Sequence, residues 1–394
     1  MQLAGKYLLL FDNFWTSFAY ALAVFFNFFA IKVYAVNENS KNRYYQKQGR
    51  ILLTFSVLSM IVFATLRDIT VGTDTVPYVE RFLDADLNSG INWEYVFTLK
   101  TGEPLFFILN ALIRTVTDNY HLYFFSVYAF ITIAFTIFLS KTYKEYASIN
   151  IDSKITFYLP IILAGTYFIH SWNVMRSWLA ISVTLFAFIQ MIEGKKWQSL
   201  AIIFVATMIH YSAVCFIFAW LLFFLDKDDR ILSNKILSFA IAFGGMLFIY
   251  GSFTVIKGYF LSTKYKSYVD SVSNWTSFAP GLIVAVGAIL FSENLKKQGL
   301  IAKACVKLQP VKVAMMAFGF FGGSRIGYFF RIQDIYLISL LYSFGSMKFK
   351  SPVVRFVFRI IIIAFVLVIF INNMANMAET SGVFPYVLST FELM

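Results

Sequence analysis

The sequence predicts an all-α integral membrane protein with about 11–13 transmembrane helices and no separate soluble domain, so residues 1–394 form one membrane domain. Composition is the first indication, because 59% of the residues are apolar, 20% are aromatic and only 14% are charged. Second, apolar segments long enough for ~30 Å of hydrocarbon recur between Trp15 and Met374. Third, the longest polar stretch, from Arg67 to Glu103, has only 37 residues, too few for an independent core.

The apolar segments give the expected helices in order. The first, 15–36, lacks the features of a cleaved signal peptide and is interpreted as a retained span. The segment 199–225 fits either two short spans or one long tilted span. Residues 104–117 suit a re-entrant or interfacial helix within an outer loop at 67–121, and a second outer loop covers 257–278. We expect spans near 15–36, 51–66, 122–140, 155–171, 177–192, 199–210, 213–225, 236–256, 279–292, 311–323, 334–347 and 360–374.

Basic residues orient the chain. The loops on one side hold 21 Lys and Arg against 8 Asp and Glu, whereas the other side, with both termini, holds 11 against 13. Cytoplasmic loops carry the excess of basic residues, so both termini are expected outside. The net charge of +12 is then mainly an orientation signal with anionic membrane lipids as partner, and not a nucleic-acid footprint. The basic loops are 37–50, 141–154, 193–198, 226–235, 293–312 and 348–359.

The kind of basic residue differs between the two sides. The outer side has six Arg and five Lys, whereas the inner side has five Arg and sixteen Lys. A guanidinium binds phosphate in a bidentate way and keeps its charge when desolvated. The outer side is therefore expected to bind a phosphate-bearing or otherwise anionic ligand.

Arg176 is the first candidate for such a ligand. It ends a short polar interruption between two apolar runs and shares one turn with His170 and Asn173. An ionisable residue at membrane depth is a functional hypothesis by default, the alternative being an anchor that faces the lipid headgroups.

A second candidate cluster is Arg325, Tyr328 and Arg331, which a helix would place on one face. Two arginines on one face repel each other, so the sequence indicates either an anion bound between them or a counter-charge from Asp334.

The acidic candidates lie in the first outer loop. Glu103 precedes Pro104, so it either complements a helix dipole or serves as a general base. Asp84 and Asp86 either hold a divalent metal or are solvated charges, and we expect solvated charges. His210 lies in an apolar run at an expected outer turn, where it either lines the site or is hydrogen-bonded within the core.

Neither a phosphate-binding loop nor a dinucleotide motif is present in the sequence. Cys215 and Cys305 lie in different settings that imply no disulfide framework.

Several short motifs, in this order and spacing across apolar segments, resemble the EpsG/Wzy-type polysaccharide polymerases, which polymerise O-antigen or capsule repeat units. The resemblance covers about residues 50–225, with a looser similarity from Arg325 to Arg331. Ser177-Trp178 departs from the family, which often has glutamine after the arginine. The motifs are Arg67-Asp68, Gly72-Thr73-Asp74-Thr75 with Tyr78, Glu103-Pro104-Leu105-Phe106, Asn173-Val174-Met175-Arg176-Ser177-Trp178-Leu179-Ala180 and His210-Tyr211-Ser212-Ala213.

The resemblance implies a GT-C-like membrane glycosyltransferase with its site at the outer face of the bacterial inner membrane. The family moves a growing glycan from undecaprenyl pyrophosphate to the non-reducing end of a lipid-linked repeat unit. In this chain Arg176, with Arg325 or Arg331, would hold the pyrophosphate with Arg67 as a helper, and Glu103 or His210 would be the base. Tyr328 would join these arginines, Asp74 and Tyr78 would hold sugar, and Asp68 and Asn173 complete the substrate-binding set. No metal or other cofactor is expected, and a chain-length regulator protein is a further candidate partner.

Two other functions are compatible with the same sequence. An O-antigen ligase expels the same undecaprenyl pyrophosphate, so the chemistry alone does not separate it from a polymerase. A flippase for lipid-linked oligosaccharides would also have many spans and buried cations. Transporters commonly show internal repeats, and we find no convincing repeat.

Overall fold

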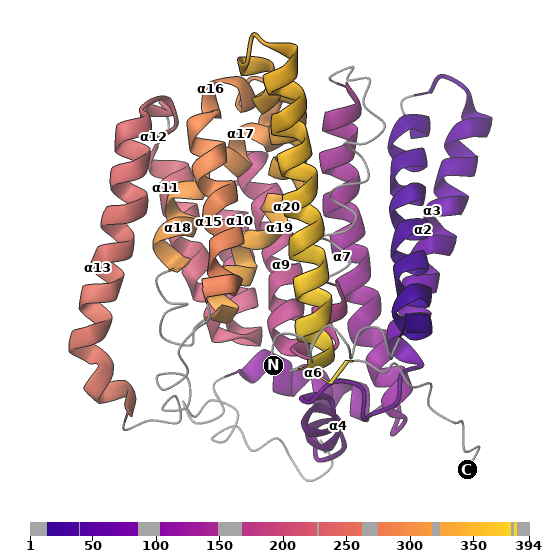
Figure 1. The fold of residues 1–394 in the computed structure, drawn as a ribbon. Helices are drawn as coiled ribbons and strands as arrows, with labels where there is room; N and C mark the ends of the chain where they lie inside the picture. Colours follow the sequence, from indigo (N-terminus) through magenta and orange to yellow (C-terminus); the bar gives the residue numbers. More distant parts are fainter. Residues whose placement is uncertain are drawn as a thin grey trace.

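The computed structural model describes residues 14–38, 40–85, 103–148, 168–226, 228–261, 275–316, 324–379 and 382–383. Within these ranges every regular element is a helix. The long helices stand side by side in one bundle (Figure 1). The prediction of an all-α chain is confirmed.

Six of the described helices are long and apolar enough to cross a membrane. The apolar window of α9 is 78% buried, whereas that of α20 is 11% buried. α9 is therefore a central helix, and α20 exposes an apolar surface of the kind that faces lipid. The six are α2 (Phe14–Glu38), α3 (Arg43–Thr65), α7 (Tyr120–Ser148), α9 (Met175–Ile192), α13 (Lys235–Leu261) and α20 (Pro352–Glu379).

Shorter helices complete the bundle around α9. At 1.5 Å per residue, a helix of fewer than about 18 residues does not cross the hydrocarbon unaided. The described long helices thus number fewer than the expected 11–13 spans. The shorter helices are α10 (Lys196–Ile209), η2 (Tyr211–Cys215), α11 (Phe216–Leu225), α12 (Arg230–Ser233), α15 (Trp275–Leu290), α16 (Ser292–Leu295), α17 (Leu300–Lys307), α18 (Gln309–Met316) and α19 (Ser324–Leu340), which continues as Leu341–Gly345 and Ser346–Lys348.

The segment 199–225 forms two short helices and not one long one. The backbone of His210 is extended, with φ −153° and ψ 120°, which ends α10. The chain then turns back, because the indole Nε1 of Trp220 in α11 donates to the carbonyl of Lys196 at the start of α10, at 3.0 Å. α10 and α11 therefore form an antiparallel hairpin with His210 at its tip.

In the last third of the chain the expected spans overlap described helices with different bounds. The span expected at 311–323 begins within α18 and runs on into residues outside the described ranges, and the span expected at 334–347 lies within α19 and its continuation to Lys348. Lys312, expected in a basic loop, is enclosed with Asp334, and its Nζ lies 2.6 and 2.5 Å from the two carboxylate oxygens. Pairing lets both charges stay inside an apolar bundle. The expected span at 155–171 lies largely outside the described residues.

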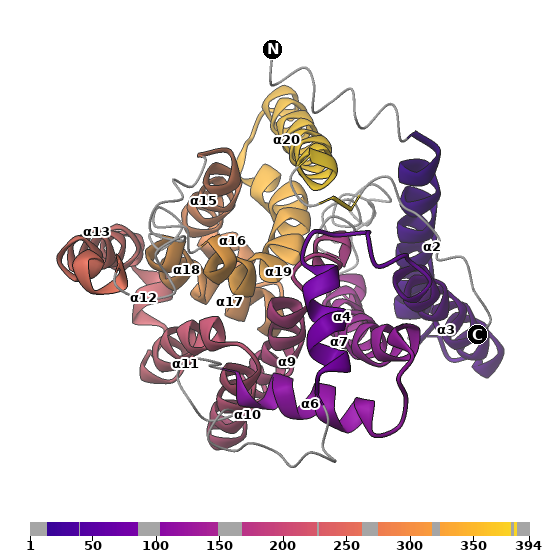
Figure 2. The same cartoon turned by 90° about the horizontal axis from the view of Figure 1, so that it is seen from below.

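The two ends of the bundle differ in character. α4 (Thr75–Leu83) and α6 (Pro104–Arg114) lie at one end, which we call the α4–α6 face. It is the lower end in Figure 1 and is viewed directly in Figure 2. At the other end lie α12, α16 and the turn after α9 with Lys195 and Lys196, which we call the lysine face. Three of the loops assigned to the cytoplasm from their charge, 193–198, 226–235 and 293–312, thus have described residues at this end of the bundle.

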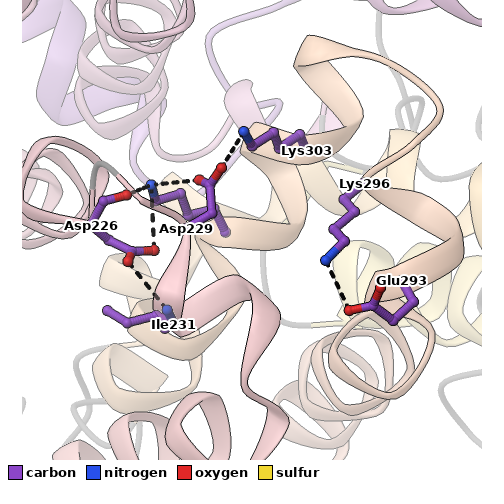
Figure 3. A network of polar contacts seen from close by, with 7 residues as sticks. Asp226, Asp229, Ile231, Glu293, Lys296 and Lys303 are labelled. Atoms are coloured by element: carbon purple, nitrogen blue, oxygen red, sulfur yellow. Dashed lines mark hydrogen bonds and ion pairs between the residues drawn. The ribbon is translucent and has the colours of Figure 1, made fainter.

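At the lysine face, ion pairs join the turn after α11 to α17 (Figure 3). Asp229 pairs with Lys303, and its Oδ1 also lies 3.1 Å from Nζ of the buried Lys307. Lys307 lies 3.4 Å from a carboxylate oxygen of Asp226. Partial burial raises the pKa of Asp229, but the hydrogen bonds and charges of Lys303 and Lys307 outweigh burial and hold it below its ordinary value. This network fixes the α10–α11 hairpin at the end opposite to its tip.

The orientation in the membrane can be tested by labelling single cysteines at the two faces. Val116, just after α6, is 85% exposed, and Lys195 is exposed at the lysine face. We expect a membrane-impermeant maleimide to label V116C in intact spheroplasts and K195C only after permeabilisation, because lysine-rich loops stay in the cytoplasm. The native Cys215 and Cys305 are buried and give a low background. The reverse labelling pattern would contradict the predicted orientation.

Candidate functional site

Three helix ends meet at the α4–α6 face and bring together a carboxylate, an imidazole and a guanidinium. Glu103 immediately precedes α6, Arg176 lies in the first turn of α9, and His210 caps the C-terminus of α10. One carboxylate oxygen of Glu103, Oε2, pairs with Nη1 of Arg176. The other, Oε1, lies 2.5 Å from Nδ1 of His210. The three residues proposed from sequence as catalytic therefore form one connected cluster.

The cluster is largely enclosed. The side chains of Glu103, His210 and Arg176 are 10%, 12% and 22% exposed. In such surroundings charges interact more strongly than in water. Each ionised group therefore needs the partner that it has here.

The contacts also indicate where the proton of His210 lies. The guanidinium beside Oε2 favours the ionised form of Glu103, and an ionised carboxylate only accepts hydrogen bonds. A proton on Nδ1 suits the 2.5 Å approach to this carboxylate, although neither ring nitrogen of His210 has a partner in hydrogen-bond geometry among the described residues. In the neutral ring that carries its proton on Nδ1, Nε2 holds the lone pair. His210 thus presents an acceptor nitrogen that no protein group in the described ranges occupies.

Local sequence explains why these side chains point at one another. Pro104 starts α6 at a position that needs no backbone N–H. Glu103 makes no side-chain capping bond, so its carboxylate extends toward α9 and α10 instead of back onto its own helix. His210 reaches the cluster because the extended backbone that ends α10 turns its ring away from the helix.

Two aromatic rings flank the guanidinium of Arg176. Its Cζ lies 5.7 Å from the ring centres of both Tyr78 in α4 and Phe106 in α6. These rings meet edge to face at 6.0 Å. Cation–π contacts of this kind fix the direction of a guanidinium. Phe106 escaped sequence reasoning as a site residue, although its position one turn after Glu103 on α6 could have indicated it.

Asn173 holds the loop before α4 against the turn before α9. Its Oδ1 accepts hydrogen bonds from the hydroxyl of Thr73 and the backbone N–H of Asp74, both at 3.0 Å. Asp74 thereby takes its place at the start of α4, beside the turn that leads to Arg176. Asn173 is predicted from sequence to bind substrate. In the structure its side-chain amide oxygen accepts the two hydrogen bonds from the loop before α4.

Residues from the far end of the chain close the same loop. The N–H of Gly72 donates to the carbonyl of Gly382 at 2.9 Å, and the adjacent Val383 is fully buried. Gly72 has φ +96° and Gly382 has φ +58°, conformations that favour glycine. The segment after α20 thus belongs to the support of the site.

His170, Tyr328 and Arg331 form a second cluster between the turn before α9 and α19. The indole of Trp178 donates to Nδ1 of His170 at 3.0 Å, so Nε2 carries the proton and donates to the hydroxyl of Tyr328 at 3.3 Å. Cζ of Arg331 lies 4.6 Å from the ring centre of Tyr328. Asp334, considered from sequence as a counter-charge for these arginines, pairs with Lys312. The side chain of Arg325 lies outside the described part of the chain.

Arg67 and Asp68 take separate positions. Arg67 is fully enclosed and donates to Tyr128 Oη at 2.8 Å and to the carbonyl of Trp172 at 3.2 Å. The carboxylate of Asp68 accepts hydrogen bonds from the N–H and hydroxyl of Thr70, at 2.9 and 2.7 Å. Of the pair considered as an alternative metal site, Asp84 ends α4 and Asp86 lies outside the described residues.

A bundle of membrane-spanning helices with an enclosed ionic cluster at one face defines a multi-pass membrane protein with a polar site at the end of its bundle. The EpsG family model matches residues 50–388. The chain therefore belongs to the EpsG family, the family of Wzy-type polysaccharide polymerases, and the resemblance noted from its motifs is confirmed. No curated protein and no solved structure matches the chain.

Gly72 offers a test of how the loop supports the site. A Cβ at Gly72 would lie 2.8 Å from Thr75 Oγ1 and 3.2 Å from the carbonyl of Trp172, at a positive φ. We expect G72A to lower the free energy of unfolding in detergent by about 1–3 kcal/mol. Activity should fall as well, because the loop supports the site. Gly194 is the matched control, because its φ is +75° but a Cβ at that position would have nothing within 4 Å. Equal losses in G72A and G194A would show that the loop contact is unimportant.

Proposed function

We propose that this protein polymerises a cell-surface polysaccharide by transferring the growing glycan from undecaprenyl pyrophosphate to the non-reducing end of a lipid-linked repeat unit. Membership of the EpsG family supports a glycosyltransferase-like polymerase in a membrane. The observation that carries the detailed chemistry is the chain of contacts from Arg176 through Glu103 to His210. The proposal includes a periplasmic site, periplasmic termini, the bacterial inner membrane and a GT-C-like architecture.

In this proposal His210 is the general base. The acceptor sugar hydroxyl loses its proton to Nε2 of His210 while its oxygen attacks the anomeric carbon of the growing glycan. The bond from that carbon to the pyrophosphate oxygen breaks, and undecaprenyl pyrophosphate leaves. Glu103 holds the ring through Nδ1 and stabilises the imidazolium that forms, as a carboxylate does beside a catalytic histidine.

Arg176 stabilises the leaving group. A guanidinium carries five N–H donors in a fixed fork, and one of its ends is directed at Glu103. The negative charge that develops on the pyrophosphate strengthens its interaction with this cation, which lowers the barrier. Two helix N-termini, those of α6 and α9, lie beside the same position and favour an anion there.

The remaining candidates have supporting places. Asp74 and Tyr78 lie next to the cluster on α4 and its N-terminal end, where they would contact sugar. Arg325 or Arg331, with Tyr328, would join Arg176 in holding the pyrophosphate. A chain-length regulator protein remains a candidate partner.

Replacement of Arg176 tests the proposal directly. We expect R176A to make no long chains while protein levels stay normal, with a loss of about 10²–10³-fold in rate because a charge that stabilises the leaving group is gone. The measurement is the product ladder made by purified protein from a defined undecaprenyl-pyrophosphate-linked repeat unit. R114A is the matched control, since Arg114 lies on α6 and pairs with Asp118. Wild-type chain lengths from R176A would sink the assignment.

The same assay separates polymerase from its competitors. A ladder of products indicates a polymerase, whereas an inert repeat unit counts against it. In cells that lack the protein, single repeat units accumulating at the outer surface indicate a missing polymerase. Lipid-linked units that accumulate facing the cytoplasm indicate a missing flippase. Transfer to the lipid A core alone indicates a ligase.

A double-variant cycle distinguishes His210 from Glu103 as the base. If His210 accepts the proton and Glu103 orients it, H210A and E103Q each lose about 10²–10⁴-fold in rate, and the double variant is scarcely worse. If Glu103 itself were the base, H210A would retain most activity whereas E103Q would not. The measurement is the rate at which each variant makes product from the same defined repeat unit.

A further inference from the structure

Arg67 is an enclosed cation without an acidic partner among the described residues. Its side chain is 0% exposed. None of the ion pairs in the described ranges includes it. The neighbouring Asp68 directs its carboxylate to Thr70. Arginine stays charged in proteins, so a full positive charge is buried here without a full negative charge from the described residues beside it.

The surroundings of Arg67 are polar and aromatic but neutral. Nη1 donates to the carbonyl of Ala64 at 3.1 Å, and Nη2 donates to Tyr128 Oη and to the Trp172 carbonyl. Its Cζ lies 4.4 Å from the ring centre of Phe124 and 4.6 Å from that of Tyr128. These groups offer partial negative charge and make the burial tolerable. They do not explain why the chain uses a charged residue where a neutral donor could bind the same oxygens.

The enclosed charge lies close behind the candidate site. The Trp172 carbonyl belongs to the turn that leads into α9 and Arg176, and Tyr128 Oη donates to the carbonyl of Ser171 in the same turn at 3.1 Å. This turn therefore joins the two guanidiniums, with Arg176 at the site and Arg67 in the interior.

We propose that Arg67 is a positioning residue whose buried charge forms the fixed half of a long-range ion pair, which the pyrophosphate of the lipid-linked donor completes when it binds at Arg176. The inference rests on the proposed function. Arg67 does not touch the ligand, because its Nη groups are turned to the protein. Its charge acts through low-dielectric protein, where attraction falls off slowly and salt screens little.

The proposal predicts that the effect of Arg67 scales with ligand charge. The full-length protein in nanodiscs would be titrated with undecaprenyl pyrophosphate, undecaprenyl phosphate and undecaprenol. We expect R67M to weaken binding of the pyrophosphate by roughly tenfold and of the monophosphate by roughly threefold, with undecaprenol unchanged. R67K keeps the charge and should stay within about threefold of wild type for all three lipids. R114M removes a cation from α6 that is paired with Asp118, and it should change none of the affinities.

The outcomes separate this role from a structural one. If Arg67 only holds the turn at Trp172, R67K and R67M lose affinity for the three lipids alike, and that result overturns the proposal. If R67M fails to fold, R67K decides between the two roles. If Arg67 acts through its charge, R67K still prefers undecaprenyl pyrophosphate over undecaprenol, whereas if Arg67 acts only structurally, R67K loses that preference. A wild-type protein that shows no such preference refutes the proposed function and this inference together. If the wild type prefers undecaprenyl pyrophosphate but the Arg67 variants lose affinity equally for all three lipids, only the role of Arg67 is refuted.

Discussion

The carboxylate of Glu103 imposes the central constraint on this fold. An ionised carboxylate that is only 10% exposed at the end of an apolar bundle needs partners, and it has a guanidinium on one oxygen and an imidazole 2.5 Å from the other. Those partners lie at the ends of α9 and α10. The start of α6 at Pro104 and the break at His210 are the local features that let three helix ends converge.

The same requirement organises charges elsewhere in the bundle. Lys312 is paired with Asp334 in the interior, and Lys307 is held by Asp226 and Asp229 at the lysine face. These ionic contacts balance opposite charges locally, so they join helices without creating a strong field. Arg67 is different in kind, since within the described residues its charge is solvated by carbonyls, a hydroxyl and aromatic rings.

Sequence reasoning performed well where chemistry is local and less well where it depends on pairing. Arg176, Glu103 and His210 stand out because each interrupts or borders an apolar run, and the structure brings them together. Lys312 was counted with a basic loop, and it is buried because Asp334 pairs with it, a contact that spacing does not reveal. Asn173 was recognised as a polar residue at membrane depth, but its bonds to Thr73 and Asp74 are tertiary contacts that no spacing reveals. Trp178, noted as a departure from the family pattern, is the donor that fixes the tautomer of His170.

The link between Gly72 and Gly382 bears on how the protein is made. The ribosome makes the loop before α4 early, whereas it makes Gly382 only after all the described helices. The loop that carries Asp74 therefore lacks one of its anchors until α20 has been made. A partly synthesised chain holds Arg176, Glu103 and His210 before this anchor is in place, so the support of the site is completed only after the described helices have been made.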